Sequence, residues 1–323
     1  MLTLVSQPQN FTPLESGIIY HITSETYTPL NISIVKSITG EVIGKKVVGQ
    51  TTDVKVDIAP YLVGHIVREP KLNNAIVLTP LAAESFHIEV TTATETLVSD
   101  TVTVSCNQTP LADTVIQSVF DTNRIICHGE QEDILLHIPE TANLEARFFT
   151  STSQRRSTFL RTEPGLVNLH IDTSMLDPEA TYFTVDIIIN GQGVETLYYN
   201  FVLRHSKSMR LMWLTAAGAI EHHTFATTLN CEQRAERKVV NLSQSGVQSI
   251  EVLSSTRLTL HSAALSSEMA DAVASIIRSP RVWIEEPTPV AVDVLTQSLT
   301  TVNGDKAAVI KLQIETKPKT ITL

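Results

Sequence analysis

The chain has 323 residues, of which 42% are hydrophobic and 18% are charged, and its formal net charge is −10. This composition supplies enough apolar material for two or three folded cores and excludes a disordered or collagen-like chain. The acidic balance, with no Lys/Arg cluster larger than the pair Arg155-Arg156, argues against direct binding to nucleic acid.

The abundance of β-branched residues indicates a β protein. The sequence contains 40 Thr and 31 Val, and such side chains lose rotamer freedom in a helix but pack well on a pleated sheet. In residues 1–106, short alternating segments separated by turn signals predict a β-sandwich of immunoglobulin or fibronectin III type. The strands are expected at Ile18–Ser24, Leu30–Ile38, Glu41–Val48, Val54–Ile58, Phe86–Val90 and Leu97–Val104.

Residues 107–205 predict a second small sandwich. A polar stretch that ends in proline, Asn107–Pro110, is typical of a linker. The dipeptide Asn190-Gly191 tolerates the positive φ angles of a tight hairpin turn, so it should join two paired strands. The strands of this segment are expected at Thr114–Phe120, Ile134–Ile138, Leu144–Thr150, Leu166–Ile171, Tyr182–Ile189 and Val194–Leu203.

Residues 206–323 predict a β-rich domain with one helix at Ser267–Arg278. The helix has an apolar stripe of Met269, Ala272, Val273, Ile276 and Ile277, a serine cap at 266 or 267, and a stop at Ser279-Pro280. Strands are expected at Arg210–Leu214, Arg281–Glu285, Val290–Val294 and Ala308–Ile314. The predicted fold class is therefore mainly β: two tandem Ig/FnIII-like β-sandwich domains followed by a β-rich domain with one packed helix.

The sequence contains no nucleophile elbow, phosphate-binding loop or zinc-protease motif. Three cysteines without CxxC spacing, Cys106, Cys127 and Cys231, favour free thiols over a disulfide framework or a zinc site. The adjacent pair Cys127-His128 does not favour a catalytic thiolate, since such pairs are built from residues distant in sequence. We therefore expect no catalytic site and a non-enzymatic protein.

Neighbouring histidines and carboxylates are candidates for metal ligands or for catalytic acids. On a strand, His222 and His223 would point to opposite faces, which disfavours chelation of one metal by both and favours surface or interface histidines. The carboxylates Glu285-Glu286 and Glu130, Glu132 and Asp133 lie beside turn signals, which favours solvated loop charges over paired catalytic acids. No cofactor and no metal are expected.

Neither a signal peptide nor a membrane-spanning segment is expected. The N-terminus lacks a positive region followed by an apolar core, and no apolar run approaches about 18 residues. The sequence therefore predicts a protein that is not inserted into a membrane.

Residues 208–225 predict a β-hairpin around a small-residue turn at Gly218. Trp213 and Phe225 would end its two strands, and we expect both to be buried where the second and third segments meet. Five residues are candidates for structural or interface roles: Arg210, Trp213, Gly218, Phe225 and Trp283.

This hairpin resembles a motif in tail- and baseplate-type structural proteins of tailed phages and of prophages of gut-type bacteria. Two other stretches also resemble that family: the N-terminal Val5–Pro8 with Phe11–Leu14, and the C-terminal order of helix, Ser279-Pro280, Val282-Trp283 and a terminal hairpin. Family members often have paired glycines and an aromatic where this chain has Ala217-Gly218 and Ile220. The hairpin positions that match are Arg210, Trp213-Leu214, Gly218, Ile220-Glu221 and Thr224-Phe225.

The resemblance implies a non-enzymatic virion structural protein in the tail or baseplate, made in the bacterial host cytoplasm. Its partners would be other copies of itself and other virion proteins, without direct contact to nucleic acid. The alternatives are a carbohydrate- or receptor-binding adhesin module, for which only Tyr198-Tyr199 and Trp283 stand out as aromatics, and a head-decoration protein.

Overall fold

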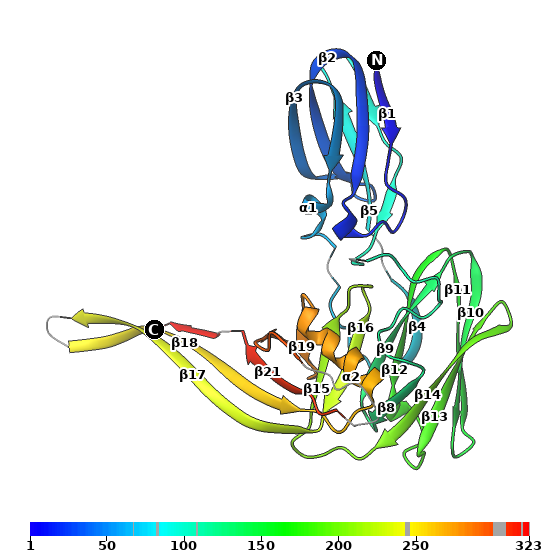
Figure 1. The fold of residues 1–323 in the computed structure, drawn as a ribbon, viewed down its shortest axis with the longest axis vertical. Helices are drawn as coiled ribbons and strands as arrows, with labels where there is room; N and C mark the ends of the chain where they lie inside the picture. The colour runs from blue at the N-terminus through cyan, green and yellow to red at the C-terminus, as the bar shows by residue number, and fades with distance from the viewer. Residues whose placement is uncertain are drawn as a thin grey trace.

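The computed structural model describes residues 1–323 apart from 67, 82–83, 108, 243–245, 300–307, 318 and 323. For residues 240–242, 246–250 and 319–322 it describes the backbone without the side chains. Strands account for 57% of the chain and helices for 7%, which confirms the predicted mainly β fold. Three modules meet at one junction, and a long hairpin projects from the third (Figure 1). None of the described helices has the length and apolar character needed to cross a membrane.

The first module is one six-stranded sheet that bends around its own core. Strands β2 and β3 pair along almost their whole length. The strands expected at Ile18–Ser24 and Leu30–Ile38 are parts of one strand, β2, and the gap between them is an irregularity in register rather than a strand end. Buried side chains such as Tyr20, Ile34 and Phe86 form the core. The elements are β1 (Leu2–Ser6), η1 (Leu14–Ser16), β2 (Ile19–Lys36), β3 (Glu41–Asp57), α1 (Ala59–Leu62), β5 (Glu84–Thr91), β6 (Thr96–Val98) and β7 (Val102–Val104).

The second module is a sandwich of a five-stranded and a three-stranded sheet. The larger sheet has the order β11-β10-β13-β14-β8 and the smaller one the order β4-β12-β9, with an apolar core between them. At the predicted hairpin turn, Asn190 and Gly191 have φ angles of 50° and 83°. The elements are β4 (Ile76–Pro80), β8 (Asn123–Cys127), β9 (Gln131–Ile138), β10 (Ala142–Thr150), β11 (Arg155–Thr162), β12 (Gly165–Asp172), η2 (Thr173–Met175), β13 (Tyr182–Ile189) and β14 (Gln192–Val202).

Strand β4 lies in the first segment of the sequence but belongs to the second module. It pairs with β12 from Ile76 to Pro80, so the sheet of residues 107–205 includes a strand from residues 1–106. The connection at Asn107 is also not an exposed linker, because the Asn107 side chain is fully buried and its amide donates to the backbone oxygens of Phe11 and Thr109. The strand predicted at Thr114–Phe120 is reduced to a single bridge between Ile116 and Leu136.

The third module is an eight-stranded sheet with the order β16-β15-β19-β20-β21-β18-β17, and β22 pairs with β18. Helix α2 packs on it through Val273 and continues as a 3₁₀ turn through Ile276, so the helix predicted at Ser267–Arg278 is present in two parts. The Ser266 hydroxyl caps it by accepting from the Met269 N–H. The elements are β15 (Met209–Leu214), β16 (Ile220–Phe225), β17 (Thr227–Leu242), β18 (Gly246–His261), α2 (Ser267–Ala274), η3 (Ser275–Arg278), β19 (Val282–Ile284), β20 (Val290–Val294), β21 (Lys311–Thr316) and β22 (Lys319–Thr322).

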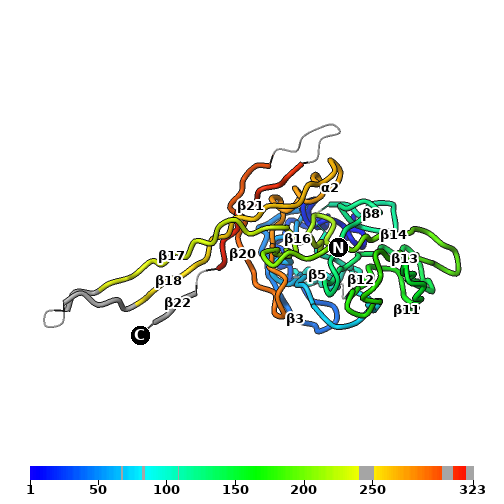
Figure 2. The backbone as a smooth tube through the Cα atoms, turned by 90° about the horizontal axis from the view of Figure 1, so that it is seen from below, coloured from blue at the N-terminus to red at the C-terminus, as the bar shows by residue number. Residues whose placement is uncertain are grey.

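Strands β17 and β18 form a hairpin that we call the arm. It extends away from all three modules in both views of the molecule (Figures 1 and 2). Every residue from 229 to 239 is exposed, on both faces of β17. The arm therefore contributes little to the core of its own chain beyond its base, where Leu258 and Leu260 are buried.

Candidate functional site at the junction of the modules

A set of buried charged side chains lies where β9 of the second module faces β15, β16 and β19 of the third. The interpretation of the carboxylates as solvated loop charges is wrong for Glu130, Glu132, Asp133 and Glu285, since the Glu130 and Asp133 side chains, for example, are 1% and 4% exposed. It holds for Glu286, which is exposed. Strand β9 is covered on both faces, so alternation leaves no wet side on which its charges could be solvated. We call this set the junction cluster; its members are Arg124, Glu130, Glu132, Asp133, His170, Arg210, Glu221, His222 and Glu285.

Arg210 on β15 is the centre of the junction cluster. Its Nε donates to Glu285 Oε2 at 3.0 Å, and its Nη2 donates to Glu132 Oε2 at 2.6 Å and to the Gln131 carbonyl at 2.7 Å. Its Nη1 donates to Glu130 Oε2 at 3.1 Å and to the Thr224 hydroxyl at 3.0 Å. All five guanidinium N–H groups thus have acceptors, which burial of a charge requires.

Arg124 on β8 extends the junction cluster through a shared carboxylate. Its Nη1 donates to Glu132 Oε1 at 3.0 Å, while the other oxygen of Glu132 accepts from Arg210. The guanidinium also lies over the rings of Phe120 and Tyr199, at 5.6 and 5.9 Å from their centroids. Glu221 Oε2 is 3.8 Å from Arg124 Nη1, and burial raises the pKa of the Glu221 carboxyl.

His222 on β16 lies between two carboxylates. Its Nδ1 is 2.9 Å from Glu285 Oε2 and its Nε2 is 3.2 Å from Asp133 Oδ2. Because both partners only accept, both ring nitrogens donate, which describes an imidazolium. Burial by itself would lower the pKa of His222, but the hydrogen bonds to Asp133 and Glu285 raise it to about 9.

A chain of polar contacts leads from Asp133 to the first module. Asp133 Oδ1 accepts from His170 Nδ1 at 3.0 Å and from the Asn168 amide, whose Oδ1 accepts from Arg68 Nη2 at 2.8 Å. Arg68 Nη1 also donates to the carbonyl of Gly218 in the β15–β16 turn. Burial would raise the pKa of Asp133, but the hydrogen bonds from His170 and His222 hold it well below its usual range.

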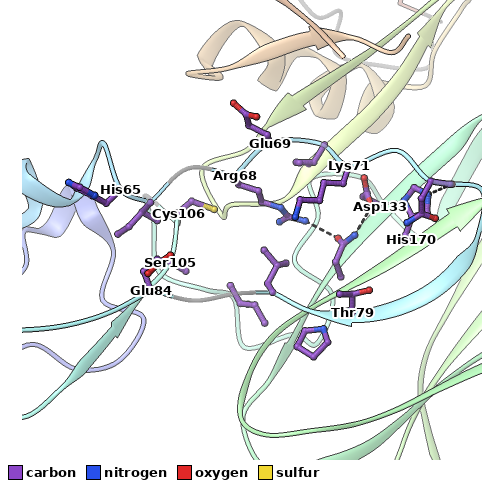
Figure 3. A pocket seen from close by; sticks show the side chains of 17 residues that line it. His65, Arg68, Glu69, Lys71, Thr79, Glu84, Ser105, Cys106, Asp133 and His170 are labelled. Carbon is purple, nitrogen blue, oxygen red and sulfur yellow. Dashed lines mark hydrogen bonds and ion pairs between the residues drawn. The ribbon is translucent and has the colours of Figure 1, made fainter. Parts of the chain in front are cut away.

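A cavity of about 390 Å³ opens beside this chain of contacts. Arg68, Cys106, Asp133 and His170 line it, as Figure 3 shows. The cavity walls come from all three modules, because Ile220 of β16 also contributes. Burial raises the pKa of the Cys106 thiol, so this cysteine stays protonated near neutral pH.

The second histidine of the pair points away from the junction cluster, as the alternation of a strand requires. His223 stacks on Phe120 at 6.4 Å between ring centroids and meets Phe225 edge-on at 5.3 Å. Burial, followed by the charge of Arg210, lowers the pKa of His223 to about 3, so it is neutral. Among the described residues, no group of three or more His, Cys, Asp and Glu side chains is arranged to hold a metal ion.

The remaining predicted structural residues surround the same hairpin. Trp213 is fully buried in the core under α2, where its Nε1 donates to Ser275 Oγ at 2.9 Å and Phe120 packs against its ring. Phe225 is fully buried in that core too. Trp283 lies on the opposite face of the sheet, in a small apolar cluster with Met212, Leu214 and Ile220.

Gly218 allows the β15–β16 turn to approach the first module closely. Its φ angle is +84°, and a Cβ at this position would lie 3.0 Å from Cys106 Sγ and 3.3 Å from the backbone nitrogen of Asn107. The turn therefore needs glycine both for its backbone conformation and for space. The predicted residues Arg210, Trp213, Gly218 and Phe225 thus lie on one hairpin that contacts both other modules.

The chemistry of the junction cluster is that of a mutual ion-pair network. The acids and bases that could move a proton are engaged with each other: His222 with Asp133 and Glu285, and Arg210 with three carboxylates. Such a network costs desolvation and is compensated only when its geometry is kept, so it fixes the relative orientation of the strands that carry it. The arrangement supports a rigid connection between the second and third modules.

Comparison with known proteins adds little to this description. No family model matches the chain, and no curated protein matches it. Among solved structures, it is similar to the three-Ig titin fragment I67–I69 in an E-to-A mutated variant, with 9% identity, coverage of 80% of this chain and 93% of that chain, and a TM-score of 0.22. It is also similar to the chicken interferon gamma receptor alpha chain, with 10% identity, coverage of 62% and 98%, and a TM-score of 0.19. Neither likeness carries an argument about function.

Proposed function

We propose that this chain is a non-enzymatic structural protein of a tailed-phage particle, which assembles in several copies in the tail or baseplate. In this role the three modules form a rigid body, and the arm makes contacts outside it. Its partners are other copies of the chain and other virion proteins, and it is made in the host cytoplasm.

The single observation that carries the assembly role is the arm. A hairpin of two 16-residue strands, exposed over residues 229–239 of β17, is costly to order unless something packs or pairs with it. Within the described part of the chain, β17 pairs only with β18, so its outer edge offers free backbone donors and acceptors. Projecting elements of this kind suit a protein that completes its contacts in an assembly.

The residues that carry the resemblance to phage structural proteins support the same proposal. Arg210 anchors the junction cluster, Trp213 fills the core under α2, and Gly218 lets the turn meet the first module. These residues hold the modules together, so the motif has a structural role. The adhesin alternative loses two of its three aromatics, because Tyr199 and Trp283 are 1% and 5% exposed and cannot stack on a sugar, whereas Tyr198 is 48% exposed.

The proposal is tested by locating the chain in particles and by shortening the arm. Antibody-gold labelling of purified phage particles should mark the tail or baseplate. Label on the head would favour the head-decoration role, and particles without any label would contradict the proposal. A variant that joins the register partners Cys231 and Leu258 through an Asn-Gly turn should keep its melting temperature but enter particles poorly. Normal incorporation of this variant would contradict a role of the arm.

A further inference from the structure

The outer edge of β17 has a charge pattern that is complementary to itself. From Asn230 to Lys238 the pairing of β17 with β18 is regular, so alternate side chains share one face. On one face these are Glu232, Arg234, Glu236 and Lys238, which alternate in sign, and all four are exposed. Arg234 Nε already contacts Glu232 Oε1 at 3.1 Å within the strand.

We propose that β17 pairs antiparallel with β17 of a second copy of this chain, with Ala235 on the two-fold axis. The inference rests on the assembly role proposed above and names its partner and register. In an antiparallel pair the two-fold axes pass between directly opposite residues, so one residue must face its own copy. With Ala235 in that place, Glu232 lies opposite Lys238 of the second copy, and Arg234 lies opposite Glu236.

Neighbouring registers are disfavoured by their charges. With Arg234 on the axis, two arginines face each other and Glu232 faces Glu236. With Glu236 on the axis, two glutamates face each other and Arg234 faces Lys238. Like charges directly opposite on a sheet are destabilising, whereas opposite charges stabilise. The registers with Gln233 or Arg237 on the axis also avoid like charges among these four residues, but each forms only two opposite-charge pairs, Glu232 with Arg234 or Glu236 with Lys238. The Ala235 register uses all four residues and forms four such pairs, so the charge pattern favours it.

The inner strand continues the same alternation. In the ladder of the arm, Glu232 is the register partner of Arg257, and Lys238 is the register partner of Glu251. In the proposed dimer, one row across four strands would therefore read Arg257, Glu232, Lys238 of the second copy and Glu251 of the second copy. The signs alternate along the whole row, and such a row favours a second copy over an unrelated strand.

Charge exchange tests the partner. The variants Glu232→Lys and Lys238→Glu should each weaken self-association on the order of tenfold, because each puts like charges opposite in both halves of the dimer. An equal mixture of the two variants should associate again, since the lysine introduced in one variant then faces the glutamate introduced in the other. Sedimentation velocity over a concentration series measures both effects. If the single variants associate as well as the unchanged protein, or if the mixture fails to recover, the proposed pairing is wrong.

Disulfide trapping tests the register, in a Cys231→Ser background. Directly opposite Cα atoms are about 4.5–5.5 Å apart, within the range of about 4.4–6.8 Å that a disulfide spans. Ala235→Cys should therefore form a covalent dimer under mild oxidation. Gln233→Cys and Arg237→Cys are matched controls on the same face: each is offset from its own copy by four residues, roughly 13 Å, but the two are opposite each other. Each alone should remain monomeric on a non-reducing gel, and their mixture should cross-link.

The outcomes separate this inference from the proposed function. If all three cysteine variants cross-link equally, or if none does while light scattering still shows oligomers, assembly uses another surface and only the β17 pairing is overturned. If the unchanged protein is monomeric at every concentration and is absent from particles, the assembly role fails as well. Circular dichroism of each variant checks that the fold is kept, which is expected because these side chains are exposed.

Discussion

Replacement of Arg210 by methionine should destabilise the protein severely. The Arg210 side chain is 2% exposed and binds Glu130, Glu132 and Glu285, so Arg210→Met leaves three carboxylates around a site without its cation. Removal of one partner from a buried ion pair typically costs about 3–5 kcal/mol. Since typical domains are stable by only about 5–15 kcal/mol, this loss is a large fraction of the total.

Urea unfolding followed by two signals measures this loss. Trp213 and Trp283 both lie in the third module, so fluorescence reports that module, whereas far-UV circular dichroism reports all sheets. In Arg210→Met, the fluorescence midpoint should fall to lower urea and separate from the circular dichroism midpoint, because the connection between the second and third modules is lost.

A matched variant defines the result that would refute this reasoning. Among the described residues, Arg257 forms one ion pair, to Glu315 Oε2 at 3.2 Å, and its side chain is 27% exposed. Arg257→Met should therefore cost at most about 1 kcal/mol. If Arg210→Met costs no more than Arg257→Met, the junction cluster does not hold the modules together.

Three further outcomes are expected. The pKa of His222 is raised from 6.5 to about 9, so the stabilisation from its charge is complete below about pH 6.5 and is lost as the pH rises through about 9. The urea midpoint of the unchanged protein should therefore fall between these pH values, and His222→Gln should make this fall smaller. A urea midpoint that does not change with pH in the unchanged protein would contradict the prediction. Trp213→Ala should cost roughly 3–5 kcal/mol through the cavity under α2, and an unchanged melting temperature would show that the ring is not a core residue. Gly218→Ala should lower the melting temperature more than Gly40→Ala, because both glycines have positive φ but only the Cβ at 218 meets another atom; equal effects would mean that the close approach to Cys106 is not limiting.

The features predicted from sequence are those set by local chemistry. The helix at Ser267–Arg278 and the turn at Asn190-Gly191 follow from periodicity, capping and positive φ, and the structure confirms both. The arm was missed because β17 is exposed on both faces, so its strand has no apolar and polar alternation to detect. Alternation of apolar and polar residues indicates a strand that is buried on one face of a sheet, and it is missing where both faces of a strand are exposed to solvent.

The junction cluster could not be predicted because its members are distant in sequence. Glu132 and Arg210 are far apart along the chain, and each looks like an ordinary surface charge beside a turn. The only local signal was the hairpin motif that includes Arg210, and it indicated a structural role without naming the carboxylates. Pairing of distant charges is a property of module packing, which short-range patterns do not encode.

The placement of β4 has a consequence for how the protein is made. Strand β4 ends at Pro80, while its partner β12 begins at Gly165, so the ribosome must add about 85 residues before the pair can form. At about 5–20 residues per second this delay is roughly 4–17 s. During that interval β4 is an unpaired strand next to a nascent first module. The second module is therefore completed by a donated strand, and a fragment of residues 107–205 should need a peptide of residues 75–81 to close its smaller sheet.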